Sequence, residues 1–172
     1  MRWTLATDGN FYGITWFGGV NNNDQGTIFQ FTPSGTLTTL HNFDGTDGSG
    51  PAGGGTLMQD TNGTFYGTMQ EGGISWPCNS IVCVGTIFSL DMGLGPFVET
   101  LPTSGKVKAA VKILGTDLTG ATSVTFNGTA ATFKVASSSE ITTNVPVGAS
   151  TGKVQVVTPN GTLTSNVVFQ VP

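Results

Sequence analysis

Hydrophobic and polar residues alternate along short segments of the chain, and glycine, asparagine and threonine fill the gaps between them. In the first part these segments are residues 26–32, 35–43, 55–60 and 63–70. Alternation with a period of two is typical of β-strands that bury one face. The chain also has few charges and many β-forming residues, so the pattern predicts an ordered, all-β protein.

An internal repeat organises this first part. The segment "DGNFYGITWFGG" at residues 8–19 returns 54 positions later as "NGTFYGTMQEGG" at residues 62–73. The segment "GTIFQF" at residues 26–31 returns 59 positions later as "GTIFSL" at residues 85–90. One period holds about four strand signals, the size of a β-propeller blade. Residues 1–96 are therefore predicted to form propeller-like repeat strands.

The repeat count is too small for a closed propeller. Residues 1–96 hold under two periods, whereas a propeller typically closes with at least about four blades. Either the chain is a fragment of a longer repeat protein, or another copy covers its open sheet edges. Open edges favour pairing with other chains, so we expect self-association.

A different pattern begins near residue 97. The segment "KVKAAVKIL" alternates strictly and predicts one half-buried strand. Its inward residues are Val107, Ala109, Val111 and Ile113. Lys106, Lys108 and Lys112 lie on the opposite face.

Further strand pairs follow this one. The segment "SVTFNGTAATFKV" predicts a hairpin around Asn127-Gly128, in which Val124 and Phe126 pair with Phe133 and Val135. The segment "EITTNVP" offers Ile141, Thr143 and Val145 to one face, and another pair of strands surrounds Asn160-Gly161. Residues 97–172 therefore predict a β-sandwich.

Both parts resemble known families. The stretch "GTIFQFTPSGTLTTLHNFDGTDGSGPAGGGTLMQDTNGTFYGT" resembles the GloVer repeat of bacterial surface and secreted proteins, which implies an extracellular, repeat-built β-structure for residues 1–96. The stretches "LPTSGKVKAAVKILGTDLTGATSVTFNG" and "ITTNVPVGASTGKVQVVTPNGTLTSNVVFQV" resemble an IPT/TIG domain, which implies an immunoglobulin-like fold for residues 97–172. Such domains are similar to binding modules and spacers of surface receptors and to accessory domains of carbohydrate-active enzymes.

Charge is divided unevenly between the two parts. Residues 1–96 carry one arginine and seven acidic residues, and residues 97–172 carry five lysines and three acidic residues. Neither part has a dense basic patch, so nucleic acid is not expected as a partner. No apolar run reaches the roughly 18 residues of a membrane span. No signal peptide is visible, which is compatible with a chain that begins inside a longer reading frame.

The two cysteines, Cys78 and Cys83, bracket the insertion that lengthens the second repeat. Their spacing does not match a zinc site, and one histidine cannot complete a typical zinc ligand set. We expect a disulfide across this loop, which would indicate an oxidising compartment. The alternative is a pair of free thiols.

The only histidine, His41, precedes Asp44 and Asp47 in the stretch "HNFDGTDG". Alternation along residues 35–43 places His41 on one face with Leu37, Thr39 and Phe43, which is typical of a satisfied core histidine. Aspartate before glycine is common turn chemistry. The alternative is a calcium ion held by Asp44 and Asp47, because this glycine-rich loop offers two carboxylates and free carbonyls.

These residues also define the enzymatic alternative. No "GxSxG" motif is present, which argues against an α/β-hydrolase. A calcium ion on Asp44 and Asp47 could polarise an ester or lactone carbonyl while His41 or Asp44 activates water. The alternative function is therefore a small calcium-assisted hydrolase.

Exposed tryptophans provide the candidate binding residues. Tyr12 and Tyr66 recur at the repeat period and are expected in the core, whereas Trp16 and Trp76 do not recur and lie beside or within long loops. The "NGT" triplets at Asn62, Asn127 and Asn160 match the glycosylation pattern, but Asn-Gly favours tight turns. The main hypothesis is an extracellular binding or adhesion protein whose partner is carbohydrate or another cell-surface molecule.

Overall fold

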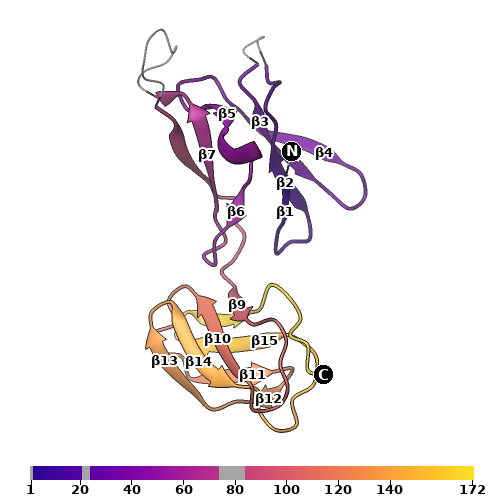
Figure 1. The fold of residues 1–172 in the computed structure, drawn as a ribbon, viewed down its shortest axis with the longest axis vertical. Helices are drawn as coiled ribbons and strands as arrows, with labels where there is room; N and C mark the ends of the chain where they lie inside the picture. The colour runs from indigo at the N-terminus through magenta and orange to yellow at the C-terminus, as the bar shows by residue number, and fades with distance from the viewer. Residues whose placement is uncertain (1, 21–23, 74–83) are drawn as a thin grey trace. The chain divides into compact units, whose positions relative to one another are not determined.

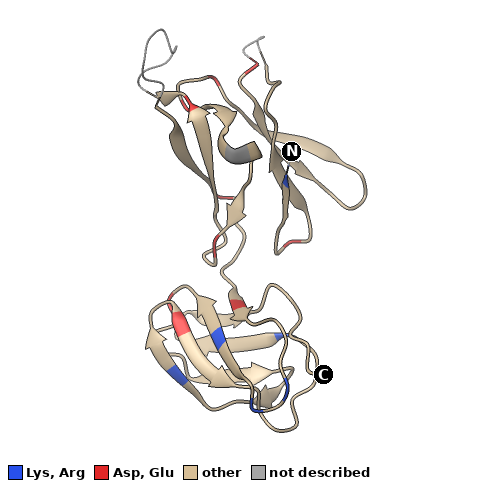
Figure 2. Ribbon diagram, viewed as in Figure 1, with Lys and Arg blue, Asp and Glu red and all other residues tan. Residues whose placement is uncertain are grey.

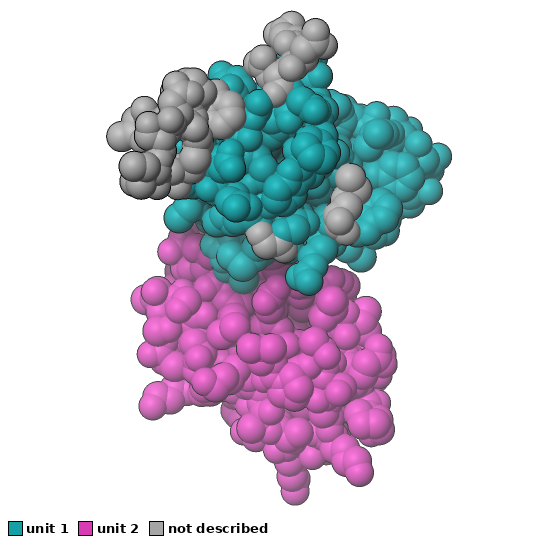
Figure 3. Space-filling model, turned by 45° about the horizontal axis from the view of Figure 1, so that its top comes forward, with its two compact units in different colours: residues 1–94 teal, residues 95–172 magenta. Residues whose placement is uncertain are grey.

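The chain folds into two compact all-β units, residues 1–94 and residues 95–172 (Figure 1, Figure 3). The computed structural model describes residues 2–20, 24–73 and 84–172. Those residues include a 3₁₀ turn, η1 (Ala52–Gly54), and contain no α-helix. The predicted all-β class is confirmed.

The first repeat forms one antiparallel sheet. Its strands are β1 (Trp3–Leu5), β2 (Phe11–Ile14), β3 (Thr27–Phe31) and β4 (Leu37–Asn42). They lie in sequential order, each paired with the next. This order follows from the short connections, because a tight turn returns the chain beside the strand it has just left. The predicted strand segments at residues 26–32 and 35–43 are confirmed.

The second repeat forms the second sheet. Its strands are β5 (Ser49–Pro51), β6 (Met58–Gln59), β7 (Phe65–Glu71) and β8 (Thr86–Leu90). The central strand β7 pairs with β5 and β6 along one edge and with β8 along the other. Strands β6, β7 and β8 occupy the repeat positions of β1, β2 and β3. No described strand pairs with the far edge of β8, so this sheet lacks a counterpart of β4.

The two sheets of the first unit pack face to face. Tyr12 on the first sheet meets Phe65 on the second, with 4.5 Å between ring centroids. The Thr4 hydroxyl donates to the Leu57 carbonyl and joins the repeats at one end. The buried core consists of Ala6, Tyr12, Ile14, Ile28, Phe43, Leu57, Phe65 and Met69. The hydrophobic core of this unit is therefore the contact between its two repeats.

A glycine beneath an aromatic ring recurs in both repeats. A Cβ atom at Gly13 would lie 2.6 Å from Cζ of Phe29, and one at Gly67 would lie 2.4 Å from Cζ of Phe88. Each glycine is paired directly with its phenylalanine across the sheet. The glycine in the repeated "FYG" segment is therefore required because the neighbouring ring occupies the space of a side chain.

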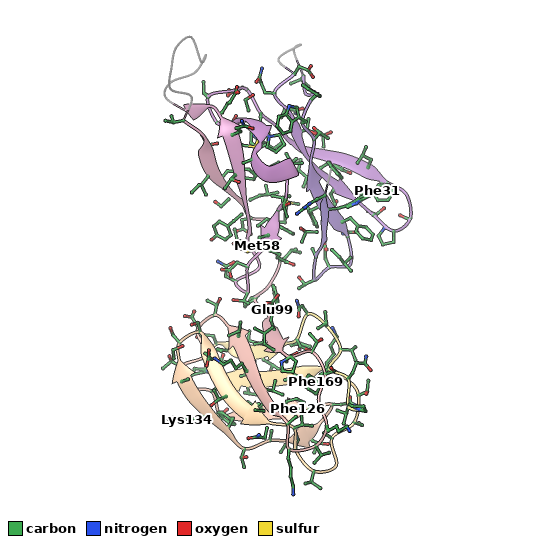
Figure 4. The ribbon with its side chains drawn as sticks, in the orientation of Figure 1. Phe31, Met58, Glu99, Phe126, Lys134 and Phe169 are labelled. Atoms are coloured by element: carbon green, nitrogen blue, oxygen red, sulfur yellow. The ribbon has the colours of Figure 1, made fainter. Side chains whose placement is uncertain are left out.

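The second unit is an immunoglobulin-like β-sandwich, as the sequence predicts. One sheet has the order β13 (Phe133–Ser137), β14 (Glu140–Asn144), β10 (Ala110–Gly115) and β9 (Val98–Leu101). The other has the order β12 (Thr129–Ala130), β11 (Ser123–Phe126), β15 (Val154–Thr158) and β16 (Gly161–Thr164). Phe126 and Phe169 meet edge to face at 5.1 Å in the core between them (Figure 4).

The predicted pairing of residues 123–135 is wrong. The turn at Asn127-Gly128 joins β11 to the short strand β12, and β13 crosses to the opposite sheet to pair with β14. Inward residues of both sheets reach the same core, so alternation alone cannot distinguish a neighbour in one sheet from a partner across the sandwich.

The strand predicted over "KVKAAVKIL" begins later than its alternation suggests. It starts at Ala110, because Lys108 has a φ of 73° and the Ala109 N–H donates to the Lys106 carbonyl in a turn. Val107 therefore lies outside the strand. Val111 and Ile113 are buried as predicted.

Candidate functional site

A hollow of about 240 Å³ in the first unit contains Trp16, one of the predicted binding residues. Trp16 and Phe17 follow the end of β2, while Gln70 and Glu71 end β7 at the equivalent repeat positions. The hollow thus lies where corresponding strands of the two repeats end. It is lined by Trp16, Phe17, Asp24, Gln25, Ser49, Gly50, Gln70 and Glu71.

Two exposed aromatic rings dominate the hollow. Trp16 is 45% exposed and Phe17 is 65% exposed, with 6.4 Å between the ring centroids. Gly50, in β5, has a φ of 56°, and a Cβ atom there would lie 3.5 Å from Cζ2 of Trp16. The indole therefore rests close to the backbone of the second sheet, which limits its movement while leaving part of its surface open to solvent.

The polar side chains of the hollow are partly held by the surrounding loop. The Gly18 N–H donates to the Asp24 carboxylate at 2.6 Å, and the Ser49 hydroxyl donates to the Gln25 side chain. Carboxylates accept hydrogen bonds from hydroxyl groups, and amides both donate and accept. An exposed indole beside carboxylates and amides suits a polyhydroxylated ligand, because apolar ring faces stack on aromatic surfaces while hydroxyls bind the polar groups.

Three of the predicted site residues lie outside the residues that the structure describes. Trp76, the second predicted binding tryptophan, and the predicted disulfide pair Cys78 and Cys83 lie in residues 74–83, outside the described residues. The binding role of Trp76 and the disulfide stay predictions.

His41 lies beside Phe43, as predicted, but not on the same face as Leu37 and Thr39. A β-bulge in β4 leaves Leu40 between the residues that pair with Phe29 and Ile28. A bulge inserts one residue and reverses the alternation beyond it. Leu37 and Thr39 therefore face one side of the sheet, whereas His41 faces the side of Ile28. The side chain of His41 is 42% exposed and meets Phe43 edge to face at 4.9 Å.

The predicted neighbours of His41 do come together. Nε2 of His41 lies 2.5 Å from Oδ2 of Asp47, and the Asp44 N–H donates to Oδ1 of the same carboxylate. The Asp44 carboxylate accepts from the N–H and hydroxyl of Thr46 and from the Asp47 N–H. Hydrogen bonds from Thr46 hold the pKa of Asp44 below its usual value. Both aspartates therefore organise the turn after β4, as Asp-Gly turn chemistry predicts.

The turn after β4 has fewer metal ligands and catalytic partners in place than its sequence suggests. Among the residues that the structure describes, no three His, Cys, Asp or Glu side chains are placed to hold a metal ion together. A cation on Asp44 and Asp47 would compete with the turn hydrogen bonds. Within the described ranges, no serine hydroxyl is hydrogen-bonded to His41, so this pair lacks the nucleophile of a serine-hydrolase triad. Calcium binding and catalysis here stay predictions.

A second hollow, of about 360 Å³, was not found from the sequence. It lies on the outer face of the first sheet and is lined by Trp3, Leu5, Phe11 and Phe31. The Trp3 ring is 6.0 Å from Phe11 and 6.2 Å from Phe31. The alternating apolar residues at positions 3 and 5 could have identified it, but β1 is too short to stand out as a strand signal.

The largest of these hollows, about 630 Å³, lies on the outer face of the second unit. Its lining includes Leu101, Lys112 and Lys134 on neighbouring strands, and Lys112 pairs with Glu140 at 3.2 Å. Lysines gather on this unit, whereas Arg2 is the single basic residue of the first (Figure 2). This lining contains no tryptophan or tyrosine, so the Trp16 hollow is the better candidate for a sugar.

Comparison with known families identifies the second unit. Residues 97–171 match the family model of the IPT/TIG domain, which confirms the resemblance of that part. IPT/TIG domains are immunoglobulin-like modules typical of extracellular or surface binding proteins. No curated protein matches the chain. The resemblance of residues 1–96 to the GloVer repeat stays a prediction.

Across the described ranges, none of the helical structure is long and apolar enough to cross a bilayer.

Proposed function

We propose that this chain is an extracellular or cell-surface binding protein whose first unit binds carbohydrate in the Trp16 hollow. The observation that carries the proposal is the combination of exposed Trp16 and Phe17 with Asp24, Gln70 and Glu71 in one hollow. The IPT/TIG domain supports an extracellular or surface location, because such domains are typical of proteins that bind there.

The chemistry of the hollow favours a neutral sugar over a charged ligand. Asp24 and Glu71 are both acidic, and none of the described residues that line the hollow is a lysine or arginine, so an anionic ligand would be repelled. Hydroxyl groups can donate to both carboxylates. A volume of about 240 Å³ suits one or two sugar rings at the end of a longer glycan rather than a fully enclosed ligand.

Affinity electrophoresis of the full chain in gels containing neutral polysaccharides tests this proposal. Retention by at least one polysaccharide is expected, and Trp16→Ala should weaken it about tenfold or more because the stacking surface is lost. Val147→Ala is the control, since it removes another exposed apolar side chain that lies outside the hollow. Retention that is absent on every polysaccharide, or unchanged in Trp16→Ala, contradicts the proposal.

The His41–Asp47 contact favours a second candidate function, calcium-assisted hydrolysis of an ester or lactone. A carboxylate that orients an imidazole can make it a general base toward water. A screen of esters and lactones should then show turnover that EDTA abolishes and that His41→Ala and Asp47→Asn both reduce. Absence of turnover with and without calcium removes this candidate and leaves the carbohydrate site unaffected.

A further inference from the structure

The first unit has two uncharged outer faces, both with exposed apolar side chains, that the described residues leave uncovered. The aromatic face, on the outer side of the first sheet, consists of Trp3, Leu5, Phe11 and Phe31. The tyrosine face, on the outer side of the second sheet, consists of Met58, Tyr66, Thr68, Ile87 and Ser89. Figure 4 labels one residue of each, Phe31 and Met58.

Repeat-equivalent residues show that each face is built to be buried. Trp3 is 58% exposed, but Leu57, its equivalent in the second repeat, is 1% exposed. Ile87 is 81% exposed, but Ile28, its equivalent in the first repeat, is 2% exposed. Large exposed apolar residues in a monomer mark a contact surface when they form a contiguous patch.

The contact between the repeats shows what each face accepts. In the core, Tyr12, Ile14 and Ile28 of the first sheet pack against Phe65 and Leu57 of the second. Tyr12 and Ile28 are the counterparts of Tyr66 and Ile87, and Phe65 is the counterpart of Phe11. The internal contact is thus a tyrosine face of one repeat on an aromatic face of the next.

We infer that a second copy of this chain places its tyrosine face on the aromatic face of the first copy. This contact would repeat between chains the packing that exists within one chain. Neither face contains a charged residue, so stacking them buries no unpaired charge. The inference places the predicted self-association on sheet faces instead of the sheet edges expected from the sequence, and it does not depend on the carbohydrate site.

The contact is head-to-tail, because the two faces are different surfaces of the same chain. Contacts of this kind either close into a ring or continue as a filament. Each chain supplies two blade-sized sheets, and propellers typically close with about four to eight blades, so a ring would contain about two to four copies. A ring covers both faces of every copy, and a filament covers both faces of every copy except the two at its ends.

Sedimentation velocity of the full chain with Trp3→Glu and Ile87→Glu tests the contact. The unaltered chain should sediment as a species of two or more copies at micromolar concentration. Each substitution puts a carboxylate into one face and should raise the dissociation constant about a hundredfold or more. Because both side chains are exposed, neither change should prevent folding. Val147→Glu, at an exposed valine of the second unit, is the matched control and should not change association.

An equimolar mixture of the two variants distinguishes the head-to-tail contact from other modes of self-association. The Trp3→Glu chain keeps an intact tyrosine face, and the Ile87→Glu chain keeps an intact aromatic face. The mixture should therefore form a one-to-one dimer, while each variant alone stays monomeric. An unaltered chain that is monomeric at about 100 µM overturns the inference, as does a mixture that stays monomeric or a single variant that still dimerises.

Discussion

The two repeats of the first unit place equivalent residues in opposite surroundings. Phe65 is fully buried, whereas its counterpart Phe11 lines an open hollow. Ile28 is buried, whereas its counterpart Ile87 is among the most exposed apolar residues of the chain. The repeated sequence decides which positions are apolar, and the position of each repeat in the stack decides which of them are covered. Exposed apolar residues in such a protein therefore mark where a stack ends.

Truncation of the two phenylalanines should give the largest difference between the repeats. Phe65→Ala leaves a cavity in the core and should lower the free energy of unfolding by about 3–5 kcal/mol. Phe11→Ala, at a half-buried position, should lower it by about 1 kcal/mol or less. Urea unfolding at low protein concentration, followed by tryptophan fluorescence, measures this. The signal reports the first unit, because Trp3, Trp16 and Trp76 all lie in it. Equal losses of unfolding free energy in the two variants would contradict the difference in burial between Phe65 and Phe11.

The glycines beneath the aromatic rings should behave alike in both repeats. Gly13→Ala and Gly67→Ala both force a methyl group into a phenylalanine ring, so each should cost about 1–3 kcal/mol. Thr68→Ala is the control, because it adds no atom and Thr68 is an exposed neighbour of Gly67 in β7. A tolerated alanine at either position in the same urea experiment would contradict the shared packing of the repeats.

The buried Tyr12 should make the first unit sensitive to alkaline pH. Burial raises the pKa of Tyr12 above its usual value of 10.0, and a hydrogen bond to Asp8 raises it further. The unfolded chain therefore loses this proton first, so stability present below pH 10 falls as pH rises toward the folded pKa. The urea midpoint should drop between pH 9 and pH 11. Tyr12→Phe should remove this part of the drop, and Tyr66→Phe should leave it in place.

The smallest effect is expected at the turn after β4. Hydrogen bonds from Thr46 lower the pKa of Asp44, so its contribution to stability is present above the usual carboxyl pKa and is lost as pH falls through the lowered value. Melting temperatures should show a slight loss on acidification toward pH 3. Asp44→Ala should flatten this acid response, while Asp44→Asn should retain most of the turn at neutral pH because an amide oxygen can accept the same bonds. An unchanged acid response in Asp44→Ala would contradict this role.

The strands were predictable from the sequence where turn residues and alternating apolar residues indicated the same strand boundaries. The repeat found from "FYG" and "GTIF" corresponds to strands β2, β7, β3 and β8, and Ile141, Thr143 and Val145 are buried as expected. The pattern failed where one residue broke its period. The bulge at Leu40 separated His41 from the face of Leu37 and Thr39, and β13 pairs in the sheet opposite β11. Local alternation contains no information about either event.

The candidate sites were predictable only in part for a related reason. Trp16 was identified because it does not recur, but its neighbours Gln70 and Glu71 lie 54 and 55 positions away, at the same point of the next repeat. Their proximity follows from stacking and not from local sequence. The aromatic face was missed because equivalent positions are expected to be buried alike, and only the structure shows which of them are exposed.

The central claim is that a tyrosine face packs on an aromatic face, and a double-mutant cycle between Tyr12→Leu and Phe65→Leu tests it most directly. These rings lie 4.5 Å apart, and such pairs interact by about 0.5–1.5 kcal/mol beyond their burial. The same cycle between Phe11→Leu and Tyr66→Leu, measured at a dilution where the chain is monomeric, should give no coupling. Coupling that is absent in the first pair, or equal in both pairs, would contradict the account.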